Sequence, residues 1–133
     1  MFYAWDITIP KNTTEDNPIK KELELTHGVI TKIAIKFPIG CSGMVKVRLL
    51  RFETPIMPLN RDGWVTGDGE TVEATYWYEL TDSPYTLNFL AISPNTQYDH
   101  TVTVRINILP PEAAGVKVLV ELLRKFFSII GVA

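Results

Sequence analysis

Hydrophobic and polar residues alternate along most of the chain, from residue 3 to residue 109. The clearest case is the segment 101–109, in which Val102, Val104, Ile106 and Ile108 alternate with polar residues. A period of two is typical of a β-strand that buries one face. The pattern therefore predicts strands at residues 3–9, 19–26, 29–37, 45–49, 64–66, 71–81, 85–92 and 101–109.

The segments between these strands are short and rich in Gly, Pro, Asn and Asp, and none of them has a helical pattern. Seven or eight strands with turn residues about every ten positions are typical of an antiparallel β-sandwich. We therefore predict an all-β fold, with jelly-roll and immunoglobulin-like topologies both left open. The Cys and Trp spacing of true immunoglobulin domains is absent.

Two regions depart from this simple pattern. Alternation breaks at residues 50–52, where we expect a bulge or the end of pairing. Residues 53–70 are predicted to be the longest irregular stretch, because Pro55 and Pro58 are incompatible with regular pairing in a central strand.

The strand 29–37 is expected to place five residues on one face and two lysines on the other. The five are Val29, Thr31, Ile33, Ile35 and Phe37. If this strand pairs with 45–49, one outer face carries Lys32, Lys36, Lys46 and Arg48. We interpret that basic face as solvated lysines that keep a sheet soluble, in preference to a site for nucleic acid or an acidic partner.

Residues 110–133 differ from everything before them. After Pro110 and Pro111, the pattern predicts one helix from residue 112 to about residue 130, with two adjacent apolar stripes. The first stripe has the 4, 3, 4, 3 spacing of a coiled-coil seam, and the second runs beside it. Their residues are Val116, Val120, Leu123, Phe127 and Ile130 in the first, and Leu119, Leu122, Phe126 and Ile129 in the second.

A helix that lies on its own domain needs only one apolar stripe. We therefore predict a sandwich domain at residues 1–109 and an apolar helix at 110–133 that serves oligomerisation or docking. Burial of the whole helix in its own domain is the first alternative. Contact with a membrane surface is less favoured, because the polar stripe holds only three basic residues, Lys117, Arg124 and Lys125.

Composition adds few constraints. The chain has 133 residues, of which 46% are hydrophobic and 21% charged, as in ordinary globular proteins. A net charge of −2 gives no reason to expect specific nucleic-acid binding. Cys41 is the only cysteine, so no intramolecular disulfide can form. Neither a signal peptide nor a transmembrane segment is visible, and we expect the protein in a virion or in the cytoplasm.

Few residues along the chain are candidates for a chemical site. The loop 60–70 contains Asn60, Asp62 and Gly63, but the spacing of a calcium loop fails at its first and last ligand positions. His27 and His100 stand alone in or near turns, and nothing beside Cys41 suggests an activated thiolate. We predict no catalytic residue, no metal site and no cofactor.

Two of the three tryptophans are candidates for a ligand surface. Trp64 lies within the loop 60–70, and Trp77 is expected on the face of its strand opposite Tyr76 and Tyr78. Exposed aromatic rings suit a sugar-binding platform, although they more often mark protein interfaces.

Three runs resemble a known group of proteins. They are YAWDITIP at residues 3–10, LTHGVI at 25–30 and GMVKVR at 43–48. Together they resemble small β-rich structural proteins of phage and prophage virions, of the capsid-associated or decoration type. The resemblance implies a protein present in many copies that performs no chemistry.

These observations predict a non-enzymatic structural protein that assembles through its C-terminal helix. Its partners would be copies of itself or a larger protein assembly such as a capsid. The alternative is a β-sandwich module that binds carbohydrate or protein.

Overall fold

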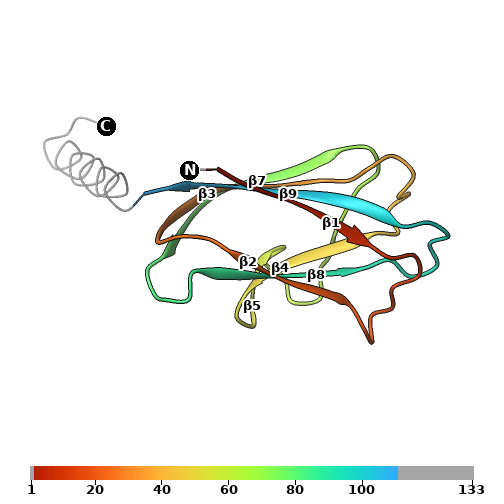
Figure 1. Ribbon diagram of the computed structural model, residues 1–133, viewed down its shortest axis with the longest axis horizontal. Helices are drawn as coiled ribbons and strands as arrows, with labels where there is room; N and C mark the ends of the chain where they lie inside the picture. Colours follow the sequence, from red (N-terminus) through yellow and green to blue (C-terminus); the bar gives the residue numbers. More distant parts are fainter. Residues whose placement is uncertain (1, 111–133) are drawn as a thin grey trace, which may run out of the picture.

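The computed structural model describes residues 2–110, which form two antiparallel β-sheets facing each other (Figure 1). The predicted C-terminal helix and the residues assigned to its two stripes lie outside the described residues. The nine strands are β1 (Phe2–Ile9), β2 (Ile19–Glu24), β3 (Gly28–Lys36), β4 (Lys46–Arg51), β5 (Thr54–Met57), β6 (Val65–Thr66), β7 (Thr71–Leu80), β8 (Thr86–Ile92) and β9 (His100–Leu109).

The strand order explains how the chain builds two layers. Sheet A has the order β1-β9-β3-β7, and sheet B has the order β2-β8-β4-β5, with β6 paired to β4. All of these pairs are antiparallel. The predicted all-β, sandwich-like fold with antiparallel sheets is therefore confirmed.

The core lies between the sheets and consists of the inward members of the alternating strands. Strand β9 shows this most clearly, because Val102, Val104, Ile106 and Ile108 are all buried while the residues between them are not. Sheet B contributes Val47, Leu49, Leu87, Phe89 and Ala91 to the same cluster. Burial of these side chains is the main force that holds the sheets together.

The faces predicted for the strand 29–37 are partly wrong. Ile33, Ile35 and Phe37 belong to the core as expected, but Ile30 takes the core position, and Val29 and Thr31 are not part of the cluster. The cause is a register shift between Ile30 and Lys32 in the pairing of β3 with both neighbours. One irregular residue moves every position before it to the other face.

The pairing of strands 29–37 and 45–49, on which a shared basic face depends, does not occur. Strand β3 lies in the middle of sheet A and β4 lies in sheet B. The connection through Gly40, Ser42 and Gly43, all with positive φ, carries the chain from one sheet to the other. Lys32 and Lys36 therefore belong to one sheet and Lys46 and Arg48 to the other, and no shared basic face exists.

The stretch 53–70 is less irregular than expected. Residues 54–57 form β5, which pairs with β4 although it contains Pro55. Proline is tolerated there because β5 ends the strand order of its sheet, where one row of backbone groups needs no partner. The short strand expected near residues 64–66 is confirmed as β6, and the break expected at 50–52 is confirmed as a register shift between Leu49 and Leu50.

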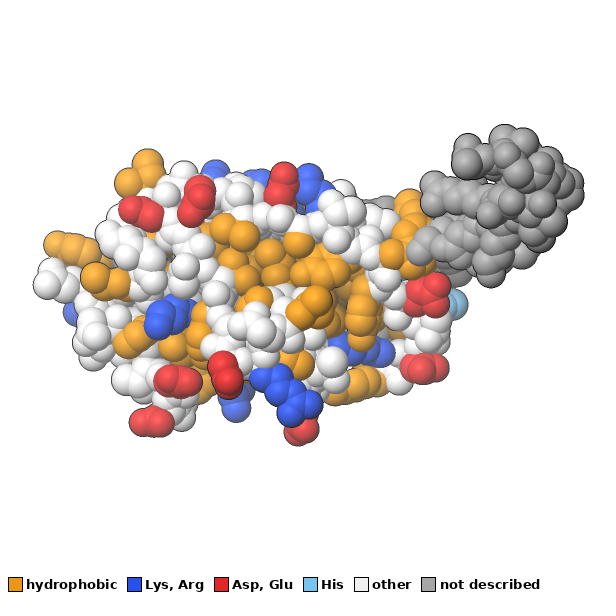
Figure 2. Space-filling view, turned by 180° about the vertical axis from the view of Figure 1, so that it is seen from behind, with side chains coloured by type: hydrophobic (Ala, Val, Ile, Leu, Met, Phe, Trp, Pro, Cys, Tyr) orange, Lys and Arg blue, Asp and Glu red, His pale blue; other side chains and the backbone are white. Residues whose placement is uncertain are grey.

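A tyrosine joins the two sheets along one flank of the molecule. Strands β1 and β2 lie on the near flank in Figure 1, and β7 and β5 occupy the opposite one. On that opposite flank the hydroxyl of Tyr76 donates a hydrogen bond of 3.0 Å to the carbonyl of Ile56 and joins the sheets. Figure 2 shows hydrophobic side chains gathered in the middle of this side.

Gly28 begins β3 and lies against the end of β9. A Cβ atom at Gly28 would overlap the carbonyl oxygen of Leu109 and lie 2.7 Å from Cγ2 of Ile108. We expect Gly28→Ala to lower the free energy of unfolding by about 2 kcal/mol, since backbone must move to relieve the overlap. Urea denaturation checks this value, with Gly43→Ala as the comparison.

At Gly43 nothing lies within 4 Å of an added Cβ, and only the positive φ of 73° opposes a side chain. Gly43→Ala should therefore cost about 1 kcal/mol. Equal losses in the two variants would contradict the close approach at Gly28.

Candidate ligand-binding groove

The outer face of sheet B carries two rows of side chains that cross the strands. The pairing of β2, β8 and β4 aligns Lys20 with Leu90 and Leu90 with Arg48. A second row beside the first aligns Glu22 with Asn88 and Asn88 with Leu50. Since neighbouring strands lie about 4.8 Å apart, each row spans about 10 Å.

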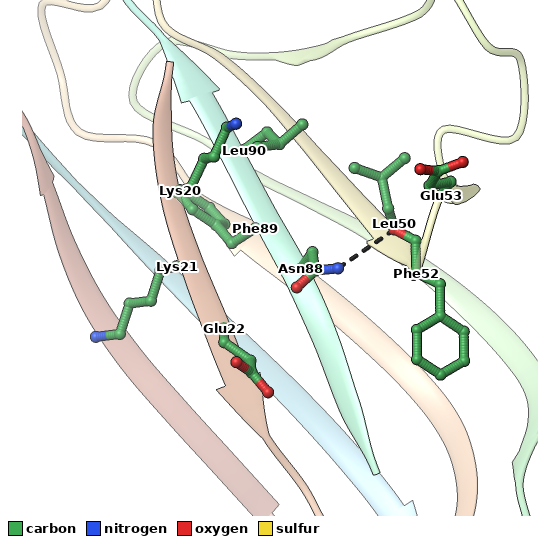
Figure 3. Close-up of a pocket in the computed structure, with 9 residues that line it drawn as sticks. All are labelled: Lys20, Lys21, Glu22, Leu50, Phe52, Glu53, Asn88, Phe89 and Leu90. Carbon is green, nitrogen blue, oxygen red and sulfur yellow. Dashed lines mark hydrogen bonds between the residues drawn. The ribbon is translucent and has the colours of Figure 1, made fainter. Parts of the chain in front are cut away.

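A hollow of about 550 Å³ lies over these rows (Figure 3). Asn88 occupies its middle, Glu22 comes from β2 on one side, and Phe52 and Glu53 come from the β4–β5 turn on the other. Leu50 and Leu90 supply apolar surface. The complete lining is Lys20, Lys21, Glu22, Leu50, Phe52, Glu53, Asn88, Phe89 and Leu90.

The wall formed by Phe52 is anchored by the residue before it. Arg51 is only 7% exposed, and its guanidinium donates to the carbonyls of Pro84, Thr86 (2.9 Å) and Asp82 (2.8 Å). A planar guanidinium has several donors in a fixed arrangement, which suits a cluster of carbonyls. Arg51 thereby ties the end of β4 to the loop that leads into β8.

Phe52 itself is held in an unusual conformation. Because Arg51 pairs with Thr54, Phe52 and Glu53 are the two residues of a hairpin turn. Phe52 has a φ of 56°, whereas Glu53 is not among the residues with positive φ. That pattern matches a type II′ turn, whose first position favours glycine.

Two contacts hold Phe52 in place. The Arg51 guanidinium lies 4.5 Å from the centre of the Phe52 ring, at cation–π distance. The amide nitrogen of Asn88 donates a hydrogen bond of 3.2 Å to the Phe52 carbonyl. The ring nevertheless stays 56% exposed, so it adds little to the core.

A second hollow of about 420 Å³ adjoins the first and shares Leu50 and Glu53 with it. Arg48 and Arg61 also line this second hollow. The Arg48 guanidinium lies 4.7 Å from the centre of the Trp64 ring, and its buried Nε has no hydrogen-bond partner. In the part of the chain that the structure describes, the only ion pair joins Lys32 to Glu73, so neither arginine is neutralised by Glu53.

The two tryptophans predicted as a ligand surface lie on different sheets. Trp64 accompanies Arg48 on the outer face of sheet B, and Trp77 belongs to β7 of sheet A. Tyr76 and Tyr78 pack against the core, which places Trp77 on the opposite face of β7 as predicted. Burial raises the pKa of the Tyr76 phenol. Trp64 and Trp77 therefore do not form one platform.

The candidate loop 60–70 and His27 both have local structural contacts. In the loop, the Gly63 amide donates a hydrogen bond of 3.0 Å to the Asn60 carbonyl, and the Asp68 carboxylate accepts one of 2.8 Å from the Gly40 amide. The ring of His27 stacks on Tyr85 at 5.4 Å. Cys41 is buried, and desolvation together with the charge of Asp68 raises its pKa, so the thiol stays protonated at neutral pH. Among residues 2–110, no three His, Cys, Asp or Glu side chains are grouped as a metal site requires.

The residues predicted as an assembly interface all lie outside the described residues. They are Val116, Leu119, Val120, Leu122, Leu123, Phe126, Phe127, Ile129 and Ile130. Within the described range, no helix is long and apolar enough to cross a membrane.

Phe52 and Asn88 were not recognised as site residues from the sequence. The one available signal was the break in alternation at residues 50–52, which the pattern assigns to a bulge without indicating the hollow beside it. Asn88 belongs to an ordinary alternating strand, so only the pairing of β8 with β2 and β4 brings it under Phe52.

The chain was compared with known protein families and with curated proteins. No family model matches it, and no curated protein matches it. The resemblance to virion structural proteins therefore stays a prediction.

Proposed function

We propose that the protein is a non-enzymatic structural protein that assembles through residues 112–130. The observation that carries this proposal is the pair of adjacent apolar stripes between Val116 and Ile130. Among residues 2–110, the buried cluster runs from Ile7 to Ile108 and both sheets contribute to it. The alternating strands thus supply an extensive core of their own.

Two apolar stripes on one helix require two neighbours. If one stripe contacts the body of the same chain, the other contacts a second chain. If neither does, both contact copies of the same helix. Either arrangement gives a homo-oligomer with closed symmetry or a protein docked on a larger assembly. The resemblance to phage virion proteins favours a capsid as that assembly.

The oligomeric mass tests this proposal. In the full chain we expect Leu122→Asp combined with Phe126→Asp to lower the mass measured by light scattering to that of a smaller species. A carboxylate buried without a partner would oppose association. Ser128→Asp, on the polar stripe, is the matched control and should leave the mass unchanged. An unchanged mass in the double variant, with Leu119→Asp giving the same result, would refute assembly through this segment.

A ligand-binding module is the second candidate, and the groove on sheet B favours it. The groove combines an exposed aromatic ring, an amide and charges of both signs. The two proposals rest on different parts of the chain, because the groove lies on the outer face of sheet B and the assembly segment comes after β9 in the sequence.

A further inference from the structure

We infer that the groove on the outer face of sheet B binds a neutral saccharide, with the ring of Phe52 as its stacking platform. The site differs from the one expected around Trp64 and Trp77. It uses instead the β4–β5 turn, exposed side chains of β2 and half-buried side chains of β8.

The first argument is conformational. Phe52 occupies the turn position that favours glycine, with a φ of 56°. A bulky residue there is strained relative to a relaxed conformation. The ring recovers little of this by burial, since it is 56% exposed. Residues held in strained conformations concentrate at functional sites, where the orientation of a side chain matters more than stability.

The second argument is the way in which the ring is held. The Arg51 guanidinium lies over the ring at 4.5 Å, and Arg51 itself is fixed by three backbone carbonyls. Asn88 holds the carbonyl of Phe52 from the floor of the hollow. An aromatic ring has two faces, so one remains for a ligand. A ring oriented in advance loses little entropy when it binds.

The third argument is the chemistry of the lining. The hollow has charges of both signs, because Lys20, Glu22 and Glu53 line it while the Lys21 side chain points away from it (Figure 3). A polyanion would meet two carboxylates, and a polycation would meet the Lys20 ammonium group. A neutral sugar has hydroxyls that both donate and accept hydrogen bonds. Its apolar C–H face matches an aromatic ring.

Calorimetric titration of the full-length protein with neutral hexasaccharides tests the inference. The probes are cellohexaose, xylohexaose, mannohexaose, maltohexaose and chitohexaose. We expect at least one to bind at millimolar concentration. Phe52→Gly should weaken that binding by roughly tenfold or more, the loss expected for one aromatic contact. Its melting temperature should not fall, because glycine accepts the positive φ.

Matched variants show whether a loss of binding comes from the missing Phe52 ring or from a change in the fold. Phe52→Trp should retain binding, since it keeps an aromatic face at the same position. Phe2→Ala removes another exposed phenylalanine, 62% exposed on sheet A, and should bind like the parent protein. The oligomeric mass of Phe52→Gly should also be unchanged, which separates this inference from the proposed assembly.

Three results would overturn the inference. The first is no heat of binding with any of the five saccharides. The second is a Phe52→Gly variant that binds as tightly as the parent. The third is binding of a neutral peptide, (Gly-Ser-Phe)₄, that depends on Phe52 while no saccharide binds, which would assign the groove to a peptide.

Discussion

Replacing Arg51 by Met is expected to lower the free energy of unfolding by about 3 kcal/mol, because three carbonyls lose a charged donor in part-buried hydrogen bonds. The guanidinium contacts the carbonyls of Asp82, Pro84 and Thr86, and the side chain is 7% exposed. Methionine fills similar volume without donating a hydrogen bond. Urea denaturation with fluorescence detection measures the loss.

The same position allows a graded test. Arg51→Lys should also lower the free energy of unfolding, but by less than Arg51→Met, because a single ammonium group cannot reach all the carbonyls that the guanidinium contacts. Arg61→Met is the matched control. Arg61 is exposed and has no hydrogen bond or ion pair with any residue from 2 to 110, so its change should stay within about 0.5 kcal/mol. A loss at Arg51 no larger than that at Arg61 would contradict the anchoring role.

The second large effect is expected at Phe89, where truncation to Ala should cost about 3–5 kcal/mol. Phe89 is 0% exposed and lies opposite Leu49 in the pairing of β8 and β4. Removing the ring forfeits its contacts and leaves a cavity between two sheets that cannot collapse freely. Phe89→Leu keeps most of the volume and should cost about 1.5 kcal/mol or less. The midpoints of urea denaturation measure these losses in the two variants.

Phe52→Ala is the contrasting variant for Phe89→Ala, because both residues line the same hollow. Because the Phe52 ring is exposed, Phe52→Ala should lower the free energy of unfolding by less than about 1 kcal/mol. Most of that loss comes from the lost contact with Arg51. If truncation at Phe52 destabilised the protein as much as truncation at Phe89, the ring would be part of the core and the groove would lose its platform.

Strand positions could be predicted because their cause is local. Alternation in segments such as 101–109 follows directly from a strand that has one buried face, and the structure has β9 there. Even the irregularity at residues 50–52 is visible, since a bulge interrupts the period. The bulge near Thr31 was missed because Val29 and Ile30 are both hydrophobic, and either residue satisfies the pattern.

Pairing between strands could not be predicted from the same information. Two neighbouring strands joined by a glycine-rich turn suggest a hairpin, yet β3 and β4 belong to different sheets. A hairpin and a crossing between sheets bury equal numbers of apolar residues locally. The choice depends on which strands cover each other across the core, and those contacts are distant in sequence.

The residues of the candidate groove could not be predicted from the sequence for the same reason. Phe52 and Asn88 are 36 residues apart, and their hydrogen bond exists only because β8 lies between β2 and β4. Trp64 and Trp77 are close in sequence but lie on opposite sheets. Exposed aromatic residues could thus be recognised, but not which of them share a surface.

The sequence alone determined that residues 2–110 are all-β, where most strands lie, and which residues alternate between core and solvent, because these properties depend on neighbours two positions apart. It also separates an apolar segment after Pro110 from the alternating body. Tertiary structure decided the sheet to which each strand belongs, the face that Ile30 takes, and the hollow beside Phe52. Those features depend on long-range pairing, in which the burial of one sheet against the other outweighs any local preference.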